Sequence, residues 1–204
     1  RYISVTGVQT CALPILVGGA LVGAEGVIGV AFTGSVEVAQ KINRSLAARP
    51  GPIATLIAET GGQNAMIVDS SALPEQVVAD AVTSAFNSAG QRCSALRVLF
   101  LQEDVADRIE KMLAGAMAEL RLGDPWSLAT DIGPVIDAEA RQNLERHIAR
   151  LRREARRVYD APPPAGLPAG EFVPPVAYGI ERIGFLTGEV FGPVLHVVRF
   201  RSEE

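Results

Sequence analysis

Four short stretches of the sequence hold residue types that could do chemistry, and the stretch around Cys93 holds the strongest nucleophile. Cys93 lies in the polar, glycine-loosened segment Gly-Gln-Arg-Cys-Ser at residues 90–94. A cysteine kept only for packing is more often found inside an apolar run. Arg92 and nearby backbone N–H groups would favour the thiolate, which is the nucleophilic form. The segment therefore predicts a reactive thiol, with a buried and inert thiol as the alternative.

A carboxylate that could act as a base ends an apolar run. Glu59 follows the strand-like residues 53–58 and precedes Thr60 and two glycines. Ligands of α/β sheets bind at the carboxyl ends of the strands. A glutamate there is ionised at neutral pH and could take a proton from water. The alternative is a surface glutamate or one that pairs along a helix.

Two further stretches suit a nucleotide. Gly34 and Ser35 stand between an apolar run and a helical pattern, where the first N–H groups of a helix favour a phosphate. Glu189 could accept hydrogen bonds from ribose hydroxyls, and Phe191 could pack against a flat group. The alternatives are an ordinary capped helix and a loop with an aromatic plug. Neither G-x-G-x-x-G nor the P-loop pattern is present at these positions.

Metal and histidine chemistry are not indicated. The two cysteines and two histidines are far apart and match no metal-ligand spacing, so we expect no metal site. His147 lies in a helical context and His196 in a strand context. A cysteine hydrolase, which would need a histidine near Cys93, stays open as a further alternative.

Composition excludes several classes of protein. Apolar residues make up 48% of the 204 residues, which is enough to bury a core and excludes disorder. The net charge of −4 argues against a general nucleic-acid binder, and we interpret the arginine-rich residues 141–157 as a solvated, ion-paired face. No apolar run reaches the ~20 residues of a membrane span. We therefore expect a soluble, cytoplasmic α/β protein.

Alternating strands and helices must position the four stretches. This alternation predicts parallel βαβ units with helices on both faces of a sheet. The apolar runs predict strands at residues 27–32, 53–58, 65–68, 95–101, 172–178 and 194–200. Helical spacing predicts helices at residues 35–48, 74–88, 103–120 and 137–157, with Ser35 as an N-cap and Pro74 in the first turn.

The chain divides by composition into three parts. Residues 4–15 resemble the translation of a sequencing-library adapter, so we interpret residues 1–15 as a non-native tail that includes Cys11. A real apolar strand ending at Pro14 is the alternative. The glycines at 61 and 62 predict a boundary between residues 16–62 and 63–204. Because the chain stops directly after a strand-like run, we expect an internal fragment of a longer protein.

Taken together and in order, the four stretches resemble the NAD(P)-dependent aldehyde dehydrogenase superfamily. The resemblance covers residues 27–200 and is carried by residues 32–35, 59–62, 90–93 and 189–193, with further landmarks at 122–125 and 133–136. Residues 59–64, 93–97 and 172–175 are similar to the L-glutamate γ-semialdehyde dehydrogenases that form a module of bacterial bifunctional proline-utilisation proteins. Thr60 and Gln63 favour this narrower match, since many superfamily members carry Leu and Lys there.

The resemblance implies a fold and a mechanism. The fold would be a three-layer α/β/α structure with parallel sheets, truncated at both ends. Residues 16–62 would be the C-terminal part of an NAD-binding domain, and residues 63–204 an incomplete catalytic domain. Cys93 would attack the aldehyde to form a hemithioacetal, hydride would pass to nicotinamide, and Glu59 would activate the water that hydrolyses the thioester. The remaining implied contacts are Gly34, Ser35, Thr60, Glu189 and Phe191 with NAD, and Arg92 and Ser94 with the substrate.

The resemblance also implies partners and missing parts. The substrate would be a small aldehyde, the cofactor NAD, and FAD would be needed only if a proline dehydrogenase domain precedes this segment. The parent would be a homo-oligomer without nucleic-acid or membrane contacts by this segment. The family's oxyanion asparagine, its ribose-binding lysine and its oligomerisation strand would lie outside the chain, so we expect the fragment alone to be inactive. Alternatives are another aldehyde, NADP with a phosphorylating or reductive outcome, and a non-catalytic nucleotide-binding or interaction module.

Overall fold

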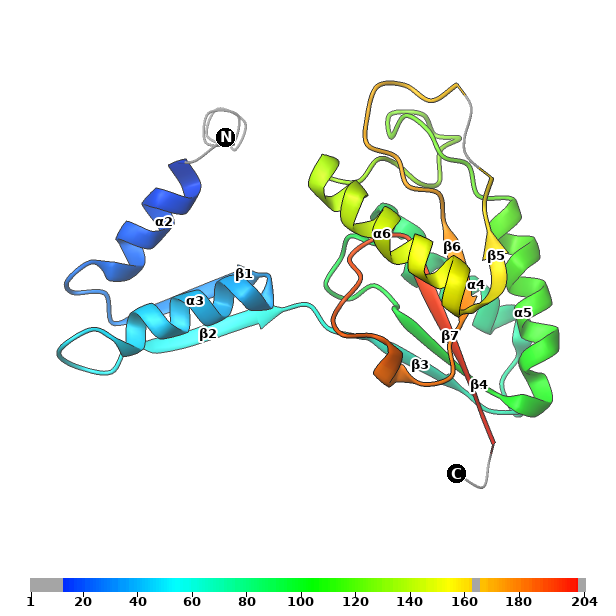
Figure 1. The fold of residues 1–204 in the computed structure, drawn as a ribbon, viewed down its shortest axis with the longest axis horizontal. Helices are drawn as coiled ribbons and strands as arrows, with labels where there is room; N and C mark the ends of the chain where they lie inside the picture. Colours follow the sequence, from blue (N-terminus) through cyan, green and yellow to red (C-terminus); the bar gives the residue numbers. More distant parts are fainter. Residues whose placement is uncertain (1–12, 163–165, 202–204) are drawn as a thin grey trace. The chain divides into compact units, whose positions relative to one another are not determined.

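The chain divides into two compact units, Arg1–Gly61 and Gly62–Glu204. The computed structural model describes residues 13–162 and 166–201 (Figure 1). Residues 1–12, which hold most of the adapter-like segment, lie outside the described residues, so its interpretation stays a prediction. No helix in the described ranges is long and apolar enough to cross a membrane.

The first unit contains one parallel βαβ arrangement preceded by a helix. Its elements are α2 (Leu13–Gly23), β1 (Gly29–Gly34), α3 (Val36–Ala47) and β2 (Thr55–Thr60). Ser35 is the N-cap of α3, and its Oγ accepts a hydrogen bond from the backbone N–H of Val38 at 3.2 Å, as its sequence position predicts. β1 and β2 pair in parallel, which places Gly34 opposite Thr60. The carboxyl ends of both strands therefore meet at one edge.

The second unit is a five-stranded sheet between helices. The strand order is β3-β4-β7-β6-β5, and every neighbouring pair is parallel except β6 and β5. The strands are β3 (Ala65–Val68), β4 (Val98–Gln102), β5 (Arg156–Asp160), β6 (Val176–Gly179) and β7 (Val194–Phe200). The helices are α4 (Pro74–Phe86), α5 (Glu103–Ala118) and α6 (Ala138–Glu154), with short turns η1 (Asn87–Gly90) and η2 (Ile183–Phe185).

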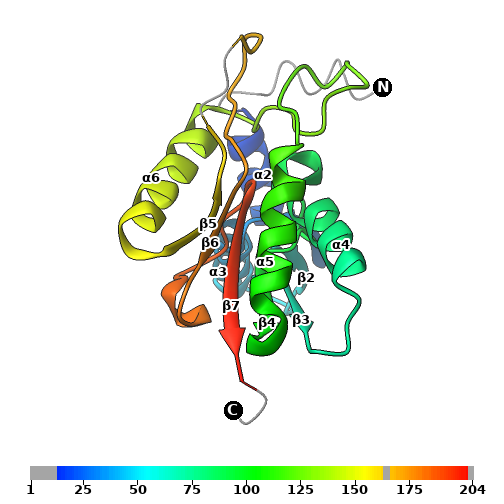
Figure 2. The same cartoon turned by 90° about the vertical axis from the view of Figure 1, so that its right-hand side faces the viewer.

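Helices cover both faces of this sheet and enclose its core. Figure 2 shows α4 and α5 together on one side of the strands and α6 on the other. Leu99 and Leu101 of β4 and Leu195 of β7 are completely buried, because a central parallel strand loses solvent on both faces. Burying one such side chain stabilises the fold by roughly 1.5–3 kcal/mol. The three-layer α/β/α arrangement confirms the predicted fold class.

The predicted helix at residues 137–157 is too long. Asp137 caps α6 by accepting a hydrogen bond from the Ala140 N–H at 2.8 Å, but the helix ends at Glu154. Arg156–Asp160 form the antiparallel edge strand β5 instead. Arg156 reaches the buried carboxylate of Glu110 with two bonds of 2.6 and 2.7 Å. This long-range ion pair overrides a helical pattern that continues through the arginines.

Other element boundaries also differ from the prediction. β1 and β2 each lie two residues later than the predicted strands at 27–32 and 53–58, β4 is Val98–Gln102 rather than 95–101, and α5 ends at Ala118 rather than at residue 120. β6 begins at Val176 rather than at residue 172, since Pro174 and Pro175 have no N–H to give to a sheet. α4 ends at Phe86, and the chain then makes a left-handed turn in which Ser88, Ala89 and Gly90 have φ values of 56°, 53° and 66°. Residues other than glycine rarely adopt this conformation. The turn is a local strain directly before Cys93.

Gly90 is required at the end of this turn. Its φ is positive, and a Cβ atom at this position would overlap the backbone carbonyl of Gly192. The absence of a side chain therefore allows the segment before Cys93 to lie directly against the segment that begins with Glu189.

We predict that Gly90→Ala destabilises the protein by on the order of 3 kcal/mol, because it adds left-handed strain and a backbone overlap. Gly115→Ala is the matched control, since nothing lies within 4 Å of a Cβ at this helical position. That change should stabilise by about 0.5–1 kcal/mol. Urea unfolding of the two variants measures both effects, and equal midpoints would contradict the assignment.

Candidate active site

Cys93 lies in a tight exposed turn between η1 and β4. The N–H of Ala95 donates to the carbonyl of Arg92 at 3.0 Å, which closes the turn around the cysteine. Cys93 is a free, exposed thiol, and Arg92 and Ser94 beside it are exposed as well. The predicted nucleophile and the two residues predicted to bind substrate are consecutive in the chain, and all three are exposed on this turn; their roles stay predictions.

Asn64 fixes the backbone of this turn. Its Nδ2 donates to the carbonyls of Cys93 and Ala95 at 2.6 and 3.0 Å. Its own carbonyl accepts from the N–H groups of Arg97 and Val98 at 3.0 and 3.1 Å. Because Asn64 directly precedes β3, and β3 pairs with β4, the sheet holds the thiol turn in place. Sequence reasoning gave Asn64 no role, although an amide between a glycine pair and a strand was the available signal.

Arg97 lies at the centre of the site and is only 1% exposed. Its Nη1 donates to the carbonyls of Gly90 and Gly192 at 2.6 and 3.3 Å, and its Nη2 donates to the carbonyl of Arg92 at 3.0 Å. Nε and Nη2 both donate to Oε1 of Glu189, at 3.2 and 3.0 Å. Burial lowers the pKa of Arg97, while the bonds to Glu189 act in the opposite direction. Sequence reasoning gave Arg97 no role.

Glu189 and Phe191 lie on the loop that Arg97 contacts. The guanidinium carbon of Arg97 is 5.1 Å from the centre of the Phe191 ring, which is a cation–π contact. The ring itself is 44% exposed. Both bonds from Arg97 use Oε1 of Glu189, so Oε2 remains available to another donor. The loop thus presents one carboxylate oxygen and one aromatic face.

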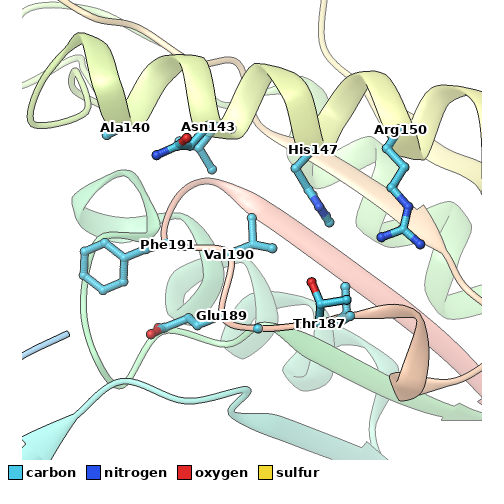
Figure 3. A pocket seen from close by; sticks show the side chains of 11 residues that line it. Ala140, Asn143, His147, Arg150, Thr187, Glu189, Val190 and Phe191 are labelled. Atoms are coloured by element: carbon cyan, nitrogen blue, oxygen red, sulfur yellow. The ribbon is translucent and has the colours of Figure 1, made fainter. Parts of the chain in front are cut away.

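A cavity of about 370 Å³ lies between this loop and α6. Figure 3 shows His147, Asn143 and Arg150 descending from α6 toward it, with Thr187 and Val190 on the opposite wall. Glu189 and Phe191 stand at the end of the cavity away from Arg150 (Figure 3).

The two histidines of the chain bond to each other. Nε2 of His147 and Nε2 of His196 are 2.9 Å apart, and Nδ1 of His196 is 3.0 Å from the carbonyl oxygen of Arg97. A carbonyl oxygen can only accept, so Nδ1 of His196 carries the proton. Burial lowers the pKa of His196 to about 4, so the ring is neutral and its Nε2 accepts from His147. Both ring nitrogens of His196 are therefore engaged, so His196 has none left to act as a base for the thiol.

The other predicted residues lie together in the first unit. Gly34 and Ser35 follow β1, and Glu59 and Thr60 end β2 at the same edge of the two-stranded sheet. Glu59 is exposed, and a Cβ at Gly34 would overlap the ring of Phe32. This edge combines a carboxylate, a hydroxyl and the N-terminus of α3.

No group of three or more histidine, cysteine, aspartate or glutamate residues is arranged to hold a metal ion within residues 13–162 and 166–201.

Residues 13–204 match the family model described as the aldehyde dehydrogenase family. The chain belongs to the aldehyde dehydrogenase family. The resemblance inferred from the four stretches is confirmed. The α/β arrangement, in which helices cover both faces of a mostly parallel sheet, is the fold of this family.

Similar proteins include bifunctional PutA proteins and a betaine aldehyde dehydrogenase. The bifunctional protein PutA of Klebsiella aerogenes is 57% identical over 92% of this chain and 15% of its own length. A crystal structure of proline utilization A from Bradyrhizobium japonicum is 59% identical, with a TM-score of 0.87 over 92% of this chain and 19% of that chain. Betaine aldehyde dehydrogenase from Staphylococcus aureus is 29% identical, with a TM-score of 0.84 over 92% of this chain and 38% of that chain. The chain thus spans less than a fifth of the length of these two PutA proteins.

We predict that His196 makes stability depend on pH. Its pKa falls from 6.5 to about 4 on folding, so the unfolded chain binds the proton more readily. The stabilisation is complete above pH 6.5 and is lost as the pH falls toward 4. From pH 7.0 to 5.5, wild type should lose roughly 1 kcal/mol that His196→Gln does not lose. Urea unfolding at both pH values measures the difference, and an equal pH dependence in both proteins would refute the prediction.

Proposed function

We propose that the chain is the part of an NAD-dependent L-glutamate γ-semialdehyde dehydrogenase that carries the nucleophile, the base and the contacts to the nicotinamide end of NAD. The observation that carries this proposal is the exposed thiol of Cys93 on a turn fixed by Asn64 and Arg97. Membership in the aldehyde dehydrogenase family and 57% identity to a bifunctional PutA support the substrate class.

The proposed reaction divides the oxidation into two steps. The Cys93 thiolate attacks the aldehyde carbon, and the carbonyl oxygen becomes the alkoxide of a hemithioacetal. Bound NAD would supply the acceptor for the hydride of this carbon, and the oxidised carbon would stay on Cys93 as a thioester. Glu59 takes a proton from water, the resulting hydroxide attacks the thioester, and the C–S bond breaks to release the carboxylate and the Cys93 thiolate.

The residues present suit NAD. The start of α3, with Gly34 and Ser35, offers backbone N–H groups at the carboxyl end of a βαβ unit, which suits a pyrophosphate. Thr60 lies opposite Gly34 in the same register. The second oxygen of Glu189 would accept from ribose hydroxyls, and Phe191 would flank the nicotinamide. NAD rather than NADP is also supported by the Staphylococcus aureus relative, whose structure is described as a complex with NAD+.

The surroundings of the thiol suit an aldehyde with an anionic group. Arg92 supplies a guanidinium and Ser94 a hydroxyl on either side of Cys93, and both are exposed. L-Glutamate γ-semialdehyde carries a carboxylate that these groups would bind. In this proposal the chain comes from a longer cytoplasmic, homo-oligomeric enzyme, with residues 16–62 and 63–204 as parts of its NAD-binding and catalytic domains. FAD belongs to the parent only if a proline dehydrogenase domain precedes this segment.

Two variants of a full-length enzyme that carries this segment test the assigned roles. Cys93→Ala should abolish NADH formation, because no thioester can form. Glu59→Gln should keep a burst of one NADH per site while the steady-state rate falls about 10²–10⁴-fold, because only hydrolysis needs the base. Rapid-mixing absorbance at 340 nm with the semialdehyde and NAD measures both.

The same experiment separates the alternatives. If another aldehyde, such as betaine aldehyde, gave a larger burst rate, the proposed mechanism would stand and the proposed substrate would be wrong. Full activity in Cys93→Ala would overturn the mechanism and favour a module in which this thiol is inert.

We predict that the 204-residue chain by itself produces no NADH from the semialdehyde. It spans 36% of the length of betaine aldehyde dehydrogenase 2 of Rhizobium meliloti, and the family's oxyanion asparagine is expected outside it. Losing one oxyanion donor typically costs ~10²–10³ in rate. Purified chain assayed at high enzyme concentration tests this, and NADH formed at a rate that scales with the chain would contradict it.

A further inference from the structure

Arg97 joins the two segments that carry the proposed chemistry in the second unit. A guanidinium has five N–H donors in a fixed planar fork. The five hydrogen bonds of Arg97 account for all five of them, and none goes to a residue of β4, the strand that begins directly after it. Two of the five bonds go to the backbone carbonyls of Gly90 and Arg92, in the segment before Cys93. The other three go to the loop that contains Glu189 and Gly192.

This set of bonds fixes the separation of the two segments. Arg92 is the residue before the thiol, and its carbonyl closes the turn that contains Cys93. Glu189 uses Oε1 for Arg97 in both bonds, which orients its carboxylate. The Phe191 ring stacks against the same guanidinium. A shift of either segment would have to break bonds to a buried cation.

We infer that Arg97 is a positioning residue that sets the distance between the Cys93 thiol and the nicotinamide held by Glu189 and Phe191. This inference rests on the proposed function. Arg97 itself is only 1% exposed, so it would act through the residues that it holds and not by touching the substrate. It acts on hydride transfer because this step depends steeply on the separation between the hemithioacetal carbon and the acceptor.

Charge alone would not perform this role. Lysine keeps the positive charge near Glu189 and Phe191, but its ammonium has three donors at one point and no planar fork. It can reach the carboxylate or the carbonyls at Gly90 and Arg92, and cannot hold both segments at the same separation. Arg97→Lys is therefore the variant that separates geometry from charge.

The test is the NADH burst of full-length enzyme carrying Arg97→Lys, measured with the semialdehyde and saturating NAD. The expected result is a burst of undiminished amplitude per titrated thiol, with a rate about 10–100-fold below wild type. A purely structural role would lower the amplitude, because fewer sites would be folded, and leave the rate constant of the remaining sites unchanged. That second pattern would overturn the inference.

Arg199→Lys is the matched control. Arg199 is the next-to-last residue of β7 in the same unit, and its guanidinium donates to Glu103, Asp107 and Glu110 of α5, away from the thiol turn. This change should lower the unfolding midpoint and leave the burst rate as in wild type. If Arg199→Lys slows the burst as much as Arg97→Lys does, the effect is general loosening and the inference is wrong.

Two further arms keep the test decisive. If Arg97→Lys does not fold, Arg97→Gln takes its place. The smaller planar amide of glutamine can still donate to the carbonyls of one of the two segments. The same loss of burst rate is expected. Absence of a burst from wild-type enzyme would overturn the proposed function and this inference together. A normal wild-type burst with an unchanged rate in the Arg97 variants would overturn this inference alone.

Discussion

The second unit is built around one buried guanidinium, that of Arg97, in which every N–H donor must have a hydrogen-bond acceptor. Removing an arginine from water is costly unless hydrogen bonds replace its hydration, and losing one partner of a buried ion pair typically costs about 3–5 kcal/mol. Arg97 meets this requirement with Glu189 and three backbone carbonyls. The left-handed turn at Ser88–Gly90 turns one of these carbonyls inward, so the strain before the thiol and the burial of the cation depend on each other.

Local features of this chain were predictable because their causes are local. Ser35 and Asp137 cap helices through bonds that span three residues, and the apolar runs at Ala65–Val68 and Val194–Phe200 become strands at the predicted bounds. The family resemblance also came from short sequence motifs, each of which lies within a few consecutive residues. The assigned roles of Cys93 and Glu59 stay predictions.

The missed features all depend on partners that are distant in sequence. Arg97 meets Glu189 across 92 positions, and His147 meets His196 across 49. Asn64 reaches Cys93 only because β3 and β4 are neighbours in the sheet. The first two residues of β5, Arg156 and Arg157, were assigned to a helix because arginines suit both an exposed helix and an edge strand. The carboxylate that decides between them, Glu110, lies on another element. Sequence spacing contains no information on such pairs until the strand order is known.

The two margins of the five-stranded sheet differ in their capacity to accept another strand. β5 pairs with β6 through an irregular register between Arg157 and Tyr159, and charged side chains line it. Such irregularity and charge discourage further pairing. The opposite margin, β3, is regular and leaves Ile67 75% exposed in the described chain. Any extension of this sheet by additional polypeptide is therefore directional, and would proceed from β3 and not from β5.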